Sequence, residues 1–505
     1  MNKLRTIACF GLIFLGFGNG LIAQQACKEV IGYYAGWQWY DRNKLMNPQS
    51  VPYQKYSILT YAFFQPQADG TLRISDPWGD KNQLLGSINW SKAPAGYDTQ
   101  YDFGNPEYHQ PGQKLSDYAH RGGCKLMVSL GGWTYSDKFP GIAADVSRRA
   151  TFARECRTIV ELYGLDGIDI DWEYPADATQ KQNFTLLLKQ VRDTLNVLSA
   201  KTQQPLLLTI AAGASPSHIS MVEWDKVAPL VDVINLMSYD FYGTWDSHTN
   251  HNAPLNAVAK HSQTGFSCSE AVKNMLAAGV PADKITLGLA WYGRSHITSG
   301  APGLQVPGTG KADMVRFAAD EGTPLYYNIL AAKSDFNSFW DSISMVPYLV
   351  SKTGNTFVSY DNERSVGLKA QEILRSRLRG AIIWEISGDY IESTAAPGTI
   401  ASTPLTDTLN KVLCAGLTTS ATRQNLQPLQ LYPNPVRNYL SIRSVLLQAG
   451  QPLAYAVCDL NGRMLLRGSL SENETTIRLS ELSPGTYFLQ LRSTSGFEQA
   501  KFVVE

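Results

Sequence analysis

The sequence has little charge, and what it has cancels. Charged residues make up 17% of the 505 residues, and 44 basic and 44 acidic side chains give a formal net charge of zero. A neutral chain has no overall electrostatic attraction to nucleic acid or to an anionic membrane surface. We therefore expect neither of these partners.

Long apolar runs are also missing. One apolar run, from Ile7 to Phe17, follows the basic residues Lys3 and Arg5, which is the pattern of a signal peptide over residues 1–23. This run is too short for a comfortable membrane span, and no later stretch approaches the roughly 20 apolar residues that a membrane helix needs. The sequence predicts a mature chain that is exported, soluble and monomeric.

Cysteines are few, and none of them form a C-x-x-C pair, which argues against a zinc site or dithiol redox chemistry. We expect neither a metal nor a cofactor. Of the seven cysteines, Cys9 leaves with the signal peptide. A bridge between Cys27 and Cys414 would join the two ends of the large domain, but an even count alone does not reveal the pairing.

Aromatic residues are plentiful by contrast, at 11% of the chain with 11 Trp. About half of these rings are expected in the core. The remainder suits a neutral, ring-shaped ligand that stacks on aromatic side chains.

Short β-branched or aromatic runs alternate with amphipathic segments through the first four-fifths of the chain. Eight such runs begin at Glu29, Tyr56, Cys124, Leu165, Leu206, Val231, Lys284 and Gly380. Eight strand and helix repeats predict a (β/α)8 TIM barrel over residues 27–416, with its active site at the C-terminal ends of the strands. A doubly wound open sheet is the alternative, but no Gly-rich phosphate loop follows the first run.

Two further segments stand out from the repeats. The interval between the seventh and eighth strands is too long for one helix, and its strand-like pieces predict an α+β insertion at about 300–360 that deepens a groove into a cleft. A polar linker is expected at 417–427. Residues 428–505 alternate short strands with turn signals, which predicts a small all-β sandwich.

Three carboxylates occupy alternate positions in "DGIDIDWEYP" (166–175): Asp169, Asp171 and Glu173. Residues two apart on a strand face the same way, so the three acids share the barrel interior. At about 4 Å each like pair costs about 4 kcal/mol at an effective dielectric near 20, so at least one proton should be retained. A carboxylic acid protonated near neutrality suits general acid catalysis and glycoside hydrolysis, and the strand spacing leaves retaining and inverting outcomes open.

The same stretch resembles the DxxDxDxE signature of glycoside hydrolase family 18 chitinases. Three more stretches resemble family motifs of the third, sixth and eighth strands: "SLGGW" (129–133), "MSYD" (237–240) and "IIWEISGD", which contains Trp384. The order and strand placement agree as well. The resemblance implies hydrolysis of the β-1,4 linkages between N-acetylglucosamine units of chitin.

The family mechanism implied by this resemblance is substrate-assisted. Glu173 would protonate the glycosidic oxygen while the acetamide carbonyl of the substrate attacks the anomeric carbon and forms an oxazolinium intermediate. Asp171 would hydrogen-bond the acetamide N–H and share a proton with Asp169. Tyr239 would hold the acetamide oxygen. Water would then open the intermediate with retention, with Glu173 acting as base.

The resemblance also implies a set of supporting and substrate-contacting residues. These are Tyr33 and Ser129 beside Asp169, Asp240 and Met237 in the acetamide pocket, Trp384 beneath the cleaved sugar, and Trp133 and Trp245 stacking on the product side. Arg294 matches a cleft residue of the family, although a plain structural ion pair fits it nearly as well. Trp37, Trp39 and Trp291 are weaker candidates.

Two rival functions remain open. The insertion resembles that of the chitinase A-type branch, which disfavours an endo-β-N-acetylglucosaminidase acting on glycoproteins, because those enzymes usually lack it. A non-catalytic chitin-binding lectin is disfavoured because such members generally lose the terminal acid of the signature, and Glu173 is present.

The tail from Leu429, with its "YPNPV" opening, resembles the type A sorting domain of the type IX secretion system in Bacteroidetes. This implies the type IX secretion machinery as a partner and a secreted or cell-surface location. The ending "AKFVVE" departs from the family because it lacks closing basic residues. A chitin-binding sandwich is the alternative, but the tail has no Trp for a sugar-stacking platform.

Overall fold

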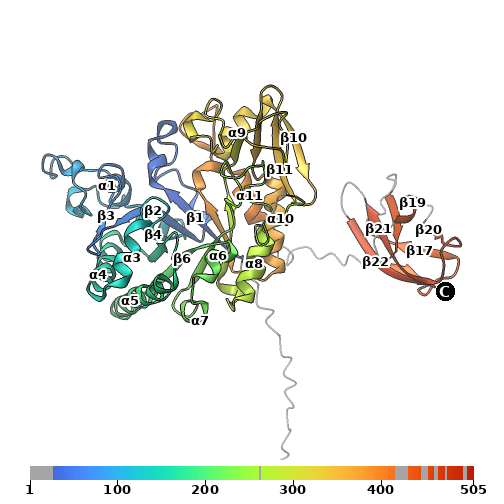
Figure 1. Cartoon of the computed structure of the whole chain (residues 1–505), viewed down its shortest axis with the longest axis horizontal. Helices are drawn as coiled ribbons and strands as arrows, with labels where there is room; N and C mark the ends of the chain where they lie inside the picture. Colours follow the sequence, from blue (N-terminus) through green and yellow to red (C-terminus); the bar gives the residue numbers. More distant parts are fainter. Residues whose placement is uncertain are drawn as a thin grey trace, which may run out of the picture. The chain divides into compact units, whose positions relative to one another are not determined.

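The computed structural model describes residues 27–260, 263–415, 430–444, 453–459, 464–471, 475–492 and 497–505. The chain divides into two compact units, Met1–Leu417 and Thr418–Glu505 (Figure 1). The expected signal peptide at 1–23 and the expected linker at 417–427 lie outside the described residues.

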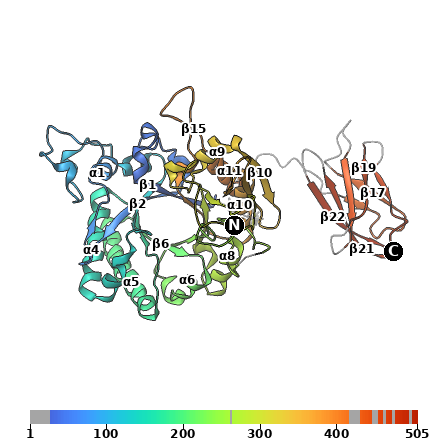
Figure 2. The same ribbon diagram turned by 45° about the horizontal axis from the view of Figure 1, so that its top comes forward.

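Eight parallel strands close into a barrel in the first unit. Figure 1 and Figure 2 draw this unit from two directions. The strands are β1 (Glu29–Ala35), β2 (Ile58–Pro66), β4 (Lys125–Gly131), β5 (Gly167–Asp171), β6 (Leu207–Gly213), β7 (Val233–Met237), β8 (Ile285–Ala290) and β13 (Gly380–Trp384). Their order is β1-β13-β8-β7-β6-β5-β4-β2, and pairing of β1 with β2 closes the ring. Each strand falls on one of the eight predicted runs, so the predicted TIM barrel is confirmed.

Helices cover the outside of this barrel. The first unit contains α1 (Gly79–Leu84), α2 (Leu115–Arg121), α3 (Phe139–Ala144), α4 (Val146–Tyr163), α5 (Ala178–Thr202), α6 (Pro216–Ser220), α7 (Trp224–Val227), α8 (Cys268–Ala277), α9 (Tyr326–Ala332), α10 (Glu363–Arg375) and α11 (Pro404–Leu413). The longest, α5, shows why they form. Asp177 caps its first turn by accepting a hydrogen bond from the N–H of Gln180 at 2.8 Å. The residues buried along one face recur at helical spacing: Phe184, Leu187, Leu188, Val191, Leu195 and Leu198.

An antiparallel sheet stands between β8 and β13, where the insertion was predicted. It has the order β10-β11-β12-β9, from β9 (Arg294–Ile297), β10 (Phe336–Asp341), β11 (Val346–Ser351) and β12 (Thr356–Ser359). The sheet begins at Arg294, before the predicted start near 300, because β9 pairs with β12. Two short additions are β3 (Leu72–Arg73), which pairs with β2, and the hairpin of β14 (Ile391–Glu392) and β15 (Ile400–Ser402).

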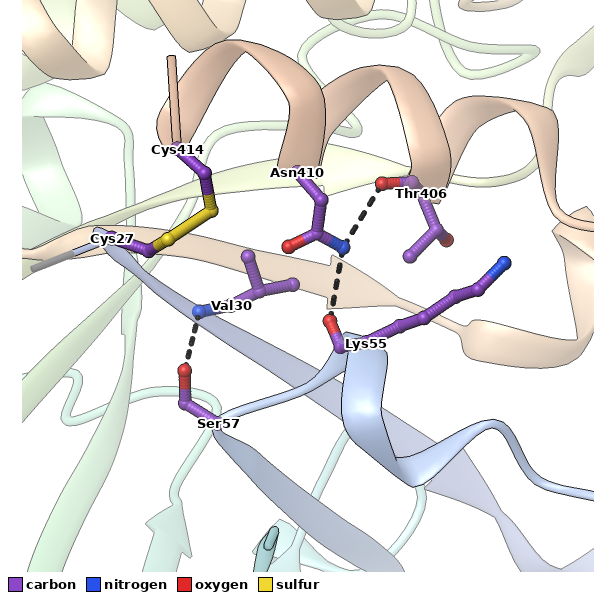
Figure 3. The surroundings of a disulfide bond; sticks show 7 residues. All are labelled: Cys27, Val30, Lys55, Ser57, Thr406, Asn410 and Cys414. Atoms are coloured by element: carbon purple, nitrogen blue, oxygen red, sulfur yellow. Dashed lines mark hydrogen bonds between the residues drawn. A yellow bond between two sulfur atoms is a disulfide. The ribbon is translucent and has the colours of Figure 1, made fainter. Parts of the chain in front are cut away.

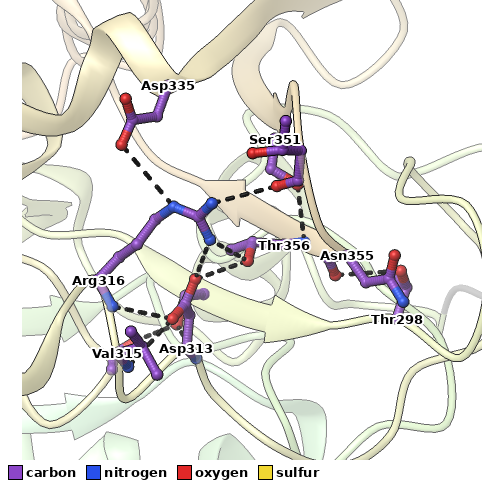
Figure 4. Close-up of polar contacts among 11 residues, drawn as sticks. Thr298, Asp313, Val315, Arg316, Asp335, Ser351, Asn355 and Thr356 are labelled. Atoms are coloured by element: carbon purple, nitrogen blue, oxygen red, sulfur yellow. Dashed lines mark hydrogen bonds and ion pairs between the residues drawn. The ribbon is translucent and has the colours of Figure 1, made fainter.

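A buried carboxylate ties the long segment after β9 to this sheet (Figure 4). Asp313 accepts hydrogen bonds from Nη1 of Arg316 at 2.9 Å and from Oγ1 of Thr356 at 2.6 Å. Its other oxygen accepts the backbone N–H groups of Val315 and Arg316. Since the side chain of Asp313 is only 4% exposed, these bonds replace the water it has lost.

A disulfide joins the two ends of the barrel unit (Figure 3). It links Cys27, two residues before β1, to Cys414 at the end of α11, across 387 positions of sequence. Beside it, Nδ2 of Asn410 donates to the backbone oxygen of Lys55 at 3.0 Å. The cysteine count left the pairing open, and the structure shows that Cys27 and Cys414 pair and join the first strand to the last helix of the barrel unit.

The described residues of the second unit form β-strands and no helix, as predicted. One sheet has the order β16-β17-β20 and the other β19-β18-β21-β22. The strands are β16 (Gln430–Tyr432), β17 (Tyr439–Arg443), β18 (Leu453–Cys458), β19 (Met464–Leu470), β20 (Thr476–Arg478), β21 (Gly485–Arg492) and β22 (Phe497–Val504). Apolar residues from both sheets form one core, among them Leu440, Val457, Leu489 and Phe502. Within the described ranges, none of the helices of the chain is both long and apolar enough to cross a bilayer.

Candidate active site

Asp169 and Asp171, the second and third acids of the signature, lie on the inner face of β5. In the barrel register Asp169 pairs with Ser129 of β4 on one side and with Thr209 of β6 on the other. Paired residues of neighbouring parallel strands point to the same face of a sheet. Asp171 ends the strand, and Glu173 follows two residues later at the C-terminal mouth of the barrel.

Asp169 is fully buried and accepts four hydrogen bonds. Its Oδ2 accepts hydrogen bonds from the hydroxyls of Tyr33 at 2.9 Å and Ser129 at 2.8 Å. Its Oδ1 accepts hydrogen bonds from Oγ1 of Thr209 at 2.5 Å and from Nδ2 of Asn235 at 3.3 Å. Burial raises the pKa of this carboxyl, and the four donors oppose that rise. Tyr33 and Ser129 were predicted as neighbours of Asp169, whereas Thr209 and Asn235 were not. The one feature that could have indicated them is that each is a polar residue within an apolar strand.

Asp171 has the opposite environment. Its side chain is buried, and its Oδ1 has no hydrogen-bond partner among the described residues. Burial, and then the charges of Glu173 and Asp169, raise the pKa of Asp171 well above its ordinary value. The surroundings of Asp171 therefore favour its protonated form and leave one of its oxygens free to accept a hydrogen bond. The proton that we expect Asp171 and Asp169 to share stays a prediction.

The carboxyl of Glu173 has a pKa near neutrality. Burial raises its pKa to about 7, the charge of Asp240 adds to the rise, and a hydrogen bond from the hydroxyl of Tyr174 opposes it. The backbone N–H of Glu173 donates to Oγ of Ser136 at 2.8 Å, which fixes the chain where it leaves β5. A group with this pKa is able to give a proton and later to take one back.

Tyr239 and Asp240 follow the end of β7. Burial, and then the charges of Asp171 and Asp240, hold the pKa of Tyr239 well above its ordinary value, so its hydroxyl remains a donor. Asp240 has a left-handed backbone with φ 56°. Its Oδ1 accepts the hydroxyl of Tyr292 at 2.7 Å and Nε of Arg294 at 2.6 Å.

Arg294 serves as both an ion pair and an aromatic contact. Besides its bond to Asp240, its guanidinium carbon lies 4.6 Å from the ring centroid of Trp245. The same ring lies against Gly243, where an added Cβ would approach it to 2.5 Å, so only glycine leaves room for it. Trp245 is 58% exposed and Trp133 is 80% exposed, which leaves both rings open to a ligand.

Trp384, the last residue of β13, packs in an aromatic group at the barrel mouth. Its ring centroid lies 5.4 Å from that of Tyr33, 5.5 Å from that of Phe63 and 6.2 Å from that of Trp37. Met237 joins the same apolar cluster as a half-buried neighbour. Phe63 was not predicted, because an aromatic residue within a strand is equally consistent with a place in the core.

Two of the weaker tryptophan candidates are wrong. Trp291 is fully buried, and its Nε1 donates to Oγ1 of Thr406 at 3.1 Å instead of facing a ligand. Trp39 is also buried, with the ammonium of Lys44 lying 3.6 Å from its ring centroid. Both follow a strand end, but the sequence does not show which way a ring turns there. In the part of the chain that the structure describes, no group of three His, Cys, Asp or Glu is placed to hold a metal ion.

Comparison with known proteins agrees with this geometry. Residues 29–389 match the model of glycosyl hydrolases family 18, and residues 430–505 match that of the secretion system C-terminal sorting domain. Chitinase A1 of Niallia circulans is 31% identical over 414 residues, which cover 72% of this chain and 56% of that protein. Endochitinase 1 of Metarhizium robertsii is 33% identical over 361 residues, covering 71% and 80%.

Among solved structures, Chitinase ChiA74 from Bacillus thuringiensis superimposes with a TM-score of 0.65 at 26% identity, over 95% of this chain and 85% of that one. The chain spans little more than half the length of Chitinase A1. Because the family model covers most of the barrel unit, including every acid of the signature, the chain belongs to glycosyl hydrolases family 18.

Proposed function

We propose that this chain is a chitinase that hydrolyses β-1,4 linkages between N-acetylglucosamine units with retention of configuration. The observation that carries the proposal is the contrast among the three acids. Asp169 is saturated by four donors, Asp171 is buried with an unpartnered oxygen, and the pKa of Glu173 is raised to about 7. Such a site has one acid ready to donate and one acceptor waiting for a polar group of the substrate.

In the first step, the carboxyl of Glu173 gives its proton to the glycosidic oxygen as the bond from that oxygen to the anomeric carbon breaks. The acetamide carbonyl of the same sugar attacks the anomeric carbon and forms a cyclic oxazolinium ion, so the protein supplies no nucleophile. Oδ1 of Asp171 accepts the acetamide N–H, and the hydroxyl of Tyr239 donates to the acetamide oxygen. Together they orient the attacking carbonyl.

In the second step, water attacks the anomeric carbon from the side that the leaving group vacated. The carboxylate of Glu173 takes the proton of that water, which regenerates the acid, and the ring of the oxazolinium opens. Two inversions give net retention. Trp384 forms the floor of the subsite, while Trp133 and Trp245 offer exposed rings to the apolar faces of further sugars.

The test is hydrolysis of chitotriose, with cellotriose as the matched substrate in which a hydroxyl replaces each acetamide group. We expect cleavage of chitotriose, no cleavage of cellotriose, and the β-anomer as the first product seen by proton NMR. Equal cleavage of both sugars, or an α-anomer first, would overturn the mechanism.

The two rival functions give different outcomes in the same series. An endo-β-N-acetylglucosaminidase would release glycans from a high-mannose glycoprotein and leave chitotriose intact. A lectin would bind chitotriose, as measured by calorimetry, without cleaving it. Either result would replace the proposal by the corresponding rival.

We propose that the C-terminal unit directs export through the type IX secretion machinery after removal of the signal peptide, giving a secreted or cell-surface enzyme. The match of residues 430–505 to a secretion system sorting domain supports this. In a host with that machinery, deletion of residues 418–505 should leave the enzyme inside the cell and its activity on chitotriose unchanged. If the unit instead binds chitin, the shortened enzyme will be exported but retained less on chitin.

A further inference from the structure

A buried asparagine connects the antiparallel insertion to the loop between β7 and α8, which carries Tyr239 and Asp240. Asn252 lies in the segment after β7 and is only 1% exposed. Its Oδ1 accepts the backbone N–H of Asp240 at 3.0 Å, and its backbone oxygen accepts the N–H of Phe241 at 3.0 Å. Its own N–H donates to Oγ of Ser359 at 2.8 Å, and Ser359 is the last residue of β12.

These hydrogen bonds are part of a closed network that returns to Asp240 through the insertion. Ser359 pairs with Arg294 in the register of β12 and β9, and Nε of Arg294 donates to the carboxylate of Asp240. Asp240 is therefore held from two directions by the same sheet, through Asn252 at its backbone and through Arg294 at its side chain. A left-handed backbone at an aspartate is held only where its surroundings fix it, and Asn252 supplies that restraint.

Two other hydrogen bonds join this loop to the insertion without involving Asp240. The N–H of Thr249 donates to the oxygen of Val306, and the N–H of Leu255 donates to that of Ser344, both at 2.9 Å. They hold the loop on either side of Asn252. Arg294 bonds the side chain of Asp240, whereas Asn252 bonds its backbone N–H.

We infer that Asn252 is a positioning residue for the cleavage reaction, through which β12 of the insertion sets the place of Asp240 relative to Glu173. The inference rests on the proposed function, since it assigns the insertion a part in the chemistry beyond that of a cleft wall. Displacement of a group at a reacting site by about 1 Å costs on the order of 100-fold in rate.

The charge of Asp240 supplies a readout that a merely structural residue would not move. It raises the pKa of Glu173, which is also faced by Asp171, Tyr174 and Tyr239. If Asp240 moves away, the pKa of Glu173 in the free enzyme falls, and the alkaline limb of the kcat/KM profile moves to lower pH.

The experiment compares kcat, KM and the alkaline limb on a chromogenic chitobioside for Asn252→Ala, Asn252→Asp and Asn256→Ala. Asn256 is the matched control, because it lies in the same loop and bonds the insertion through Ile343 at 3.3 Å without contacting Asp240. We expect Asn252→Ala to lower kcat about 10- to 100-fold with a smaller change in KM, and to move the limb to lower pH. Asn252→Asp keeps the accepting oxygen, so its limb should stay at or above that of the wild type.

Several results would overturn the inference. They are a folded Asn252→Ala enzyme with wild-type kcat and alkaline limb, an Asn252→Asp limb displaced like that of Asn252→Ala, or the same displacement in Asn256→Ala. If Asn252→Ala does not fold, Ser359→Ala decides, because it removes the acceptor on the insertion side and should move the limb in the same direction. A wild-type enzyme that cleaves no chitobioside would instead contradict the proposed function.

Discussion

Asp169 and Asp171 lie two residues apart on the same face of β5, yet the first accepts four hydrogen bonds while Oδ1 of the second has no partner in the described structure. The barrel therefore satisfies the hydrogen-bonding capacity of Asp169 and leaves that of Asp171 unsatisfied. Asp169 joins β1, β4, β6 and β7 around the inside of the barrel. Asp171 has a buried acceptor without a hydrogen bond, which lowers the stability of the fold and is expected at a functional position.

Alanine substitutions should therefore have opposite effects on stability. Asp169→Ala leaves four buried donors without their acceptor and should lower the free energy of unfolding by about 1–3 kcal/mol. Asp171→Ala removes a carboxyl that folding has desolvated without compensation, so the barrel should be as stable as the wild type or more stable. Both variants should lose activity. Equilibrium denaturation followed by tryptophan fluorescence measures the difference, and equal destabilisation by the two would contradict it.

The pH dependence of kcat/KM should follow Glu173. The proposed acid acts in its protonated form, and burial raises its pKa to about 7 in the free enzyme, so kcat/KM should fall as the pH rises through about 7. Asp240→Asn keeps the acceptor for Arg294 but removes a negative charge that raises this pKa. Its alkaline limb should consequently lie at lower pH. Asp246→Asn, in the same loop, is the control and should leave the limb in place.

The exposed tryptophans should affect binding more than chemistry. Trp133→Ala and Trp245→Ala each remove a stacking face, so we expect KM for chitin oligomers that reach the product side to rise about 2- to 10-fold. Activity on short chromogenic substrates should change less. Trp291→Phe is the contrasting variant, because its ring is fully buried: it should lower stability and leave KM unchanged. A rise in KM for Trp291→Phe equal to that of the other two would refute this division.

The disulfide should stabilise the barrel without assisting catalysis. Closing a loop of this length restricts the unfolded chain, so replacing both Cys27 and Cys414 with Ser should cost about 2–5 kcal/mol. The kcat of the folded variant should equal that of the wild type. The other described cysteines are buried free thiols, so a reductant should lower the melting temperature of the wild type but not that of the double variant. A reductant effect of equal size on both would point to another cause.

The barrel and its acids could be read from the sequence because both have a repeating signature. Strand runs recur between helices, and acids at every second position must share a face. The site residues that were not predicted lack such a pattern. Thr209 and Asn235 are single polar residues in apolar strands, and only the barrel register brings them to Asp169. Asn252 and Ser359 are over a hundred positions apart, so their contact depends on how the insertion packs.

The direction of an aromatic side chain was likewise beyond the sequence. Trp291 and Trp384 each come at the end of a strand, and one is buried beneath α11 while the other lies at the mouth of the barrel. Pairing across a long interval also decided where the insertion begins, since β9 is defined by its partner β12.

The most direct measurement is kcat of Glu173→Gln on a chromogenic chitobioside whose leaving group requires protonation, taken at pH 6 beside the wild type. The substitution keeps the shape of the side chain and removes only its acid. We predict a loss of about 10²- to 10⁴-fold, the usual contribution of a general acid, with KM little changed. A folded Glu173→Gln enzyme within about tenfold of the wild type would contradict the assignment of Glu173 as the acid.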